Sequence, residues 1–178
     1  MYLNNLLFEK LYNKATELNL DIVQFIHFSN DDPKIFKLEY VYMPKNVIIS
    51  QPELKTAFLM QFGKNRLGSC ATRMIWNKFV RRTTYIEAIE DLGDEYMNHI
   101  FRLYEDTLMM FELSQVANSY YYYEIEGYRH CTFNSGKTKN NNETIENEIL
   151  AMNQLLLVKL LLYKVDPKYD RYHIYREL

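Results

Sequence analysis

The chain of 178 residues has the size of one folded domain, and its composition is that of a packed protein. Hydrophobic residues make up 48% of it, aromatic residues 15% and charged residues 25%, which excludes a disordered chain. The formal net charge of −2 at pH 7 conceals a strong separation of charge along the sequence. We expect a single globular domain over residues 1–165 and a polar tail over residues 166–178.

The sequence predicts a cytoplasmic protein. Cys70 and Cys131 are far apart and lack the spacing of a metal or redox site, so we expect them to be reduced. Residues 1–20 have neither the charged start nor the unbroken apolar run of a signal peptide. The most apolar run, residues 155–163, contains Lys159 and is much shorter than the roughly 20 residues that a spanning helix needs. The sequence predicts a soluble protein with no membrane partner, no metal site and no cofactor.

The first quarter of the chain predicts a helix followed by three strands. Leucines at helical spacing between Leu3 and Leu18 indicate an amphipathic helix of about 17 residues. Ile22 to Phe28 is β-branched and aromatic, and Phe36 to Tyr42 alternates apolar and charged residues, so both are predicted strands. Asn46 to Ser50 is predicted to be a third, short, buried strand.

The centre of the chain predicts helices. Pro52 and Glu53 indicate the start of one that ends near Gly63. A second begins after Gly68, and a third begins at Asp94 after a break near Gly93. The side chains expected to face inward from the last two helices include Ile75, Phe79, Ile86, Leu108 and Phe111.

The last third predicts a hairpin and a long helix. Tyr120 to Ile125 and Tyr128 to Phe133 are predicted to pair about Glu126 and Gly127, and residues 134–142 form a polar loop. Residues 144–164 form an apolar helix, which we expect to be buried in the core, with pairing in a homodimer as the alternative. The fold class is α+β, with an N-terminal helix, a small three-stranded sheet, central helices, a β-hairpin and a buried C-terminal helix.

Charge is segregated into two blocks. Residues 54–86 contain no acidic residue, whereas residues 87–126 contain carboxylates opposed by the single basic residue Arg102. The predicted basic helix would place cations on one broad face, which can neutralise phosphates. The candidate nucleic-acid or partner-binding residues are Arg66, Arg73, Asn77, Lys78, Arg81 and Arg82. Alternatively, the basic and acidic helices lie side by side and their charges compensate. The acidic block is either a solvated surface or a docking face for a basic partner.

Four consecutive tyrosines cannot share one face of a strand, because alternate side chains point to opposite faces. We expect Tyr121 and Tyr123 to be buried, and Tyr120 and Tyr122 to lie outward as interface aromatics. The alternative is that a helix covers the second face as well.

Motifs for catalysis are weak. Residues 135–138 resemble the end of a phosphate-binding loop, but Cys131 occupies the position of its first glycine. The four histidines are scattered and no pair has the spacing of a zinc site.

The helix, three strands and helix expected over the first 62 residues loosely resemble the core of restriction-endonuclease-like nucleases. That resemblance implies a divalent metal held by Asp31 or Asp32 and by Glu53, with Lys55 positioning or activating the attacking water. The family places its Glu-x-Lys motif on a strand, whereas here Pro52 indicates a helix start.

The leading hypothesis is a non-enzymatic binding or regulatory protein that recognises a protein, a nucleic acid or a complex of both. The abundance of Phe, Tyr, Ile, Asn and Lys is typical of an AT-rich genome, which suits an accessory or inhibitor protein of a virus, phage or mobile element. The alternative function is a divalent-metal-dependent nuclease.

Overall fold

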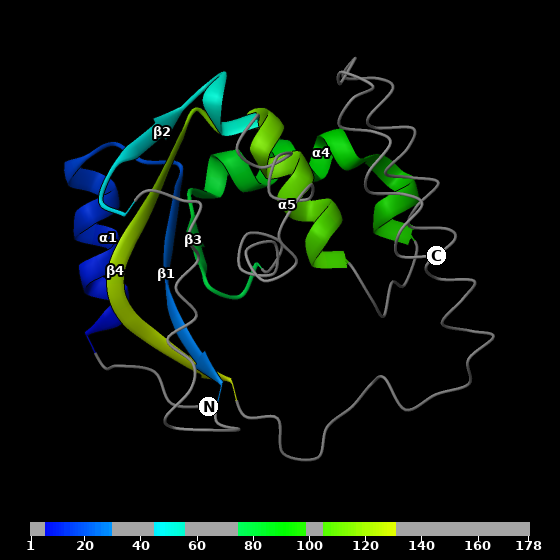
Figure 1. Cartoon of the computed structure of the whole chain (residues 1–178). Coiled ribbons are helices and arrows are strands. Elements are labelled where there is room, and N and C mark those ends of the chain that lie inside the picture. The colour runs from blue at the N-terminus through cyan, green and yellow to red at the C-terminus, as the bar shows by residue number, and fades with distance from the viewer. Residues whose placement is uncertain (1–5, 30–44, 56–74, 99–104, 131–178) are drawn as a thin grey trace.

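The computed structural model describes residues 6–29, 45–55, 75–98 and 105–130 (Figure 1). Their elements, in chain order, are α1 (Leu7–Glu17), β1 (Ile22–Ser29), β2 (Ile48–Ser50), β3 (Lys78–Val80), α4 (Arg82–Asn98), α5 (Glu105–Val116) and β4 (Ser119–His130). Helices pack on a four-stranded mixed sheet, so the α+β class is confirmed. In these ranges none of the helices is both long and apolar enough to cross a membrane.

The sheet is built around a central parallel pair. Its strand order is β2-β4-β1-β3, with β1 parallel to β4 and both edge strands antiparallel to their neighbours. Ile22 lies opposite Tyr120, and Val23 lies opposite Tyr121. Parallel neighbours need a long crossover, and α4 and α5 occupy part of the chain between these two strands. A parallel pair is normally buried on both faces, which accounts for the buried residues Ile22 to Ile26 of β1, all apolar except Gln24.

Two layers of helix cover the two faces of the sheet (Figure 1). On one face, Leu7 and Leu11 of α1 pack in a cluster with Val23, Phe25 and Tyr121. The opposite face packs against α4 and α5, and its cluster includes Ile22, Ile26, Ile49, Leu92, Leu108, Phe111 and Tyr120. The period-two alternation of each central strand therefore separates the interior into two apolar cores.

Several predicted elements are confirmed in the described ranges. The first helix and the strand from Ile22 are present, and residues 53–55 are helical after Pro52. The break at Gly93 is confirmed, because this residue has φ 76° and ψ −179° inside α4. The short strand over residues 46–50 is present as β2, but only Ile49 of it is buried, because β2 is an edge strand.

The predicted helix through residues 75–82 is wrong. Lys78–Val80 is β3, and the helix begins only at Arg82. Phe79 lies opposite Val23 in the sheet, so backbone pairing with β1 replaces helical hydrogen bonds. The expected inward orientation of Ile86 is also wrong, since 41% of its surface is exposed on α4.

The predicted hairpin about Gly127 is wrong as well. Ser119–His130 is one continuous strand, and the register with β1 shifts where Ile26 faces Glu126 and His27 faces Tyr128. Gly127 lies between these two partners. A Cβ atom there would lie 2.5 Å from Cδ2 of Phe25 and 2.7 Å from Cδ2 of Leu7. The glycine therefore allows close approach of α1 and β1 rather than a chain reversal.

The remaining elements expected from the sequence lie outside the described residues. They are the strand over 36–42, the polar loop over 134–142, the apolar helix over 144–164 with its possible pairing in a homodimer, and the tail over 166–178.

Gly127→Ala is expected to lower the unfolding free energy by about 1–3 kcal/mol, because the new methyl group overlaps two buried side chains. Leu7→Ala removes one of the clashing groups. In a double-mutant cycle measured by urea unfolding, the combined loss should be clearly smaller than the sum of the two single losses.

Gly93→Ala serves as the matched control. Nothing lies within 4 Å of its added Cβ, so its loss of about 1–3 kcal/mol would come only from the positive φ. Its effect should add to that of Leu7→Ala. If the losses caused by Gly127→Ala and Leu7→Ala simply added, Gly127 would not be needed for the close approach of α1 and β1.

Candidate functional site

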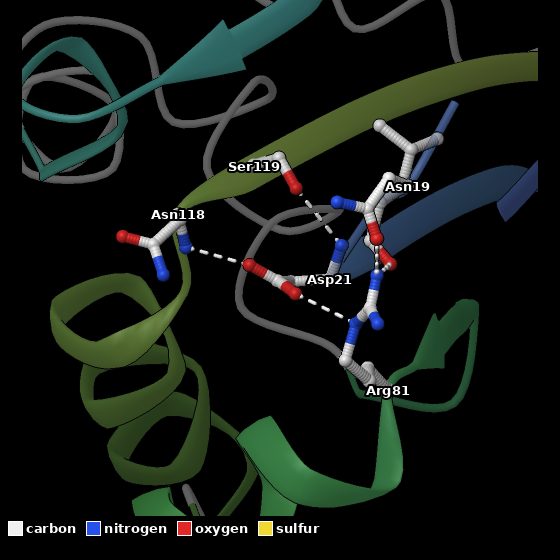
Figure 2. A network of polar contacts seen from close by, with 6 residues as sticks. Asn19, Asp21, Arg81, Asn118 and Ser119 are labelled. Carbon is white, nitrogen blue, oxygen red and sulfur yellow. Dashed lines mark hydrogen bonds and ion pairs between the residues drawn. The ribbon is translucent and has the colours of Figure 1, made fainter. Parts of the chain in front are cut away.

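Polar contacts gather at one end of the sheet, where β1 and β4 begin and β3 ends (Figure 2). Asp21 immediately precedes β1, and Arg81 connects β3 to α4. Asn118 and Ser119 lie at the start of β4. Side chains from three parts of the sequence therefore meet at this end.

Asp21 is the centre of the cluster. Its Oδ2 accepts a hydrogen bond from the backbone N–H of Asn118 at 2.8 Å, and its Oδ1 lies 2.8 Å from Nε of Arg81. Its backbone N–H donates to Oγ of Ser119 at 2.9 Å, and its carbonyl accepts from the N–H of Arg81 at 2.7 Å. Because only 12% of the Asp21 side chain is exposed, these charge-assisted bonds are partly shielded from water.

Arg81 extends the cluster to the end of α1. Its guanidinium donates to Oδ1 of Asn19 at 2.8 Å and to the carbonyl of Leu20 at 3.0 Å. Asn19 has a φ of 52°, which asparagine tolerates better than most residues. The guanidinium thus joins the turn after α1 to the start of β1. The Asp21–Arg81 cluster is a structural clamp between β1, β3 and β4, and it engages a cation that the sequence assigned to partner binding.

Two other candidate binding residues are buried wholly or in part. Asn77 is fully buried, accepts the N–H of Phe25 through its carbonyl at 3.1 Å, and lies beside Lys78. Nζ of Lys78 donates to Oδ1 of Asn77 at 2.5 Å. Burial lowers the pKa of Lys78 well below its usual value of 10.5, and the carboxylate of Asp106 on α5 offsets this only in part. The prediction that Asn77 lies on an exposed face is therefore wrong, and Lys78 is half-buried on a strand instead of lying on a helical face.

The predicted basic face is not assembled in the described ranges. Arg82 is exposed at the start of α4, and Arg81 is paired with Asp21. Arg66 and Arg73 lie outside the described residues. Charge compensation within the fold describes Arg81 better than a free binding face, although its partner precedes β1 instead of lying in the acidic block.

Tyr120 and Tyr122 are buried, contrary to the expectation that they face outward. They are 1% and 3% exposed and belong to the core that packs against α4 and α5. Tyr121 and Tyr123 pack on the α1 side. Both faces of β4 are covered over residues 120–122, so neither Tyr120 nor Tyr122 is an accessible interface anchor.

A polar row crosses the interior on the α5 side. Gln24 of β1 lies opposite Lys78 of β3 and opposite Tyr122 of β4. The hydroxyl of Tyr120 donates to Oε1 of Gln24, and both residues are buried. Burial raises the pKa of Tyr120 well above 10.0, and Tyr122 adds to this, so the hydroxyl keeps its proton and remains a donor. Gln24 is not among the site residues predicted from the sequence. The signal that could have found it is its place as a polar residue between the apolar residues of β1.

The residues of the nuclease hypothesis are only partly described. Glu53 is exposed and Lys55 is half-buried, and both lie in a helical turn with buried Leu54 between them. Asp31 and Asp32 fall outside the described residues. Within the described part of the chain, no three His, Cys, Asp or Glu side chains are placed to hold a metal ion.

An aromatic pair on α1 was missed by the sequence reasoning. Phe8 and Tyr12 are one helical turn apart, and they are 57% and 62% exposed. Leu7 and Leu11, their sequence neighbours, are fully buried. The signal was present in the spacing, since Phe8 and Tyr12 lie off the leucine stripe that predicts the buried face.

Asp21→Asn is expected to lower the unfolding free energy by about 1–3 kcal/mol, because the backbone N–H of Asn118 and the guanidinium of Arg81 lose their charged acceptor. In a cycle with Arg81→Gln, the coupling should be about 0.5–1 kcal/mol, since the guanidinium is partly exposed. The more exposed pair of Lys45 and Glu124 is the control, with smaller coupling expected. Equal coupling in both pairs would argue against a special role for Asp21.

Lys78→Met is expected to raise the unfolding free energy near neutral pH. It should also make the unfolding free energy depend less on pH in the alkaline range. Between the lowered pKa of Lys78 and 10.5, the unfolded chain binds more protons than the folded chain. The wild-type unfolding free energy should therefore rise with pH across this window, and urea unfolding at several pH values measures the slope. Lys10→Met, on the exposed side of α1, controls for the loss of one charge. A less stable Lys78→Met variant with an unchanged slope would contradict this.

Comparison with known proteins yields no relative. No family model matches the sequence, no curated protein matches it, and no solved structure matches the fold.

Proposed function

We propose that this chain is a non-enzymatic binding protein that recognises a protein partner through the outer surface of α1. The observation that supports the proposal is the exposure of Phe8 and Tyr12 on one side of a helix whose other side is anchored in the core. Exposed aromatic side chains offer large contact areas with few rotatable bonds to immobilise, and such residues are frequent binding hot spots.

The position of the pair suits a docking surface. Leu7 and Leu11 hold α1 on the sheet, so Phe8 and Tyr12 are not required for the core. Lys14 and Glu17 form an ion pair of 2.7 Å elsewhere on the same helix. A partner can thus bury the aromatic pair without displacing the contacts that hold α1 in place.

A protein partner fits the described surface better than a nucleic acid. Phosphate recognition relies on accessible cations, but Lys78 is half-buried in β3 and Arg81 is paired with Asp21. The solvent side of α4 instead carries exposed carboxylates, namely Glu87, Glu90, Asp91 and Asp94. Those charges would repel a phosphate backbone.

The origin suggested by composition remains part of the proposal. An accessory or inhibitor protein of a virus, phage or mobile element acts by binding a component of its host or of a competitor. Such a role needs a recognition surface and no catalytic residues.

Phe8→Ser combined with Tyr12→Ser should abolish partner binding and leave the melting temperature nearly unchanged, because both side chains are already mostly exposed. The measurement is affinity purification of the tagged protein from its native host with quantitative mass spectrometry. Proteins enriched by the wild type and lost with the variant are the candidates, and titration with the purified candidate then gives the affinity.

The matched control is Tyr85→Ser with Ile86→Ser, which removes two exposed apolar side chains from α4. This variant should retain the partner. Retention of the same proteins by the α1 variant, at full affinity, would refute the assignment of the surface. Binding that disappears after nuclease treatment of the lysate would instead indicate a nucleic-acid target.

The nuclease alternative makes the opposite prediction. The proposed binding protein should leave single- and double-stranded DNA and RNA intact in the presence of Mg²⁺ or Mn²⁺. Cleavage by the purified protein that is lost in both Glu53→Ala and Lys55→Ala, with the fold retained, would replace the binding proposal with metal-dependent hydrolysis.

A further inference from the structure

We draw no further inference here: the strongest candidate, the solvent-facing acidic surface of α4 formed by Glu87, Glu90 and Asp94 beside the exposed Ile86, is a cluster of carboxylates for which nothing in the described residues shows what covers it.

Discussion

The parallel pairing of β1 with β4 is the interaction on which the rest of the described structure depends. Each strand contributes alternate side chains to two separate cores, so both helical layers rest on this pair. Asp21 and Ser119, which meet where the two strands begin, are 98 residues apart in sequence. Closing so long a loop is entropically unfavourable, and the hydrogen bonds of Asp21 fix the register at the point of closure.

The clamp also determines which side chains remain for a partner. Arg81 joins β1 to the start of α4, and Lys78 is half-buried opposite Gln24. Both cations therefore make contacts within the fold. Fewer cations are left for the phosphate-binding surface that the sequence suggests. Tyr120 to Tyr123 of β4 likewise pack in or against the two cores. Within Leu7–Glu17, the large apolar side chains that remain exposed are Phe8 and Tyr12, and the proposed function rests on them.

Long sequence patterns predict the elements of this fold more accurately than short ones. The first helix and β1 were predictable because their apolar patterns run over many residues. The sequence predicts a helix where Lys78–Val80 forms a strand, because a strand of three residues is too short to show alternation. The apolar spacing of Ile75, Phe79 and Ile86 fits a helical period instead. The sequence predicts a turn at Gly127, because sequence alone does not distinguish a reversal from a site of close packing. The exposure of Phe8 and the pairing of Arg81 with Asp21 depend on tertiary contacts that no local pattern specifies.

Native-state hydrogen exchange tests the central role of the β1–β4 pair most directly. The account predicts that the amides of Val23 to Ile26 and of Tyr120 to Tyr122 exchange most slowly of those described, and that they exchange only through global unfolding. Asp21→Asn should then accelerate exchange in both strands together. Faster exchange in these strands than in the first half of α4, or acceleration confined to one strand, would contradict the account.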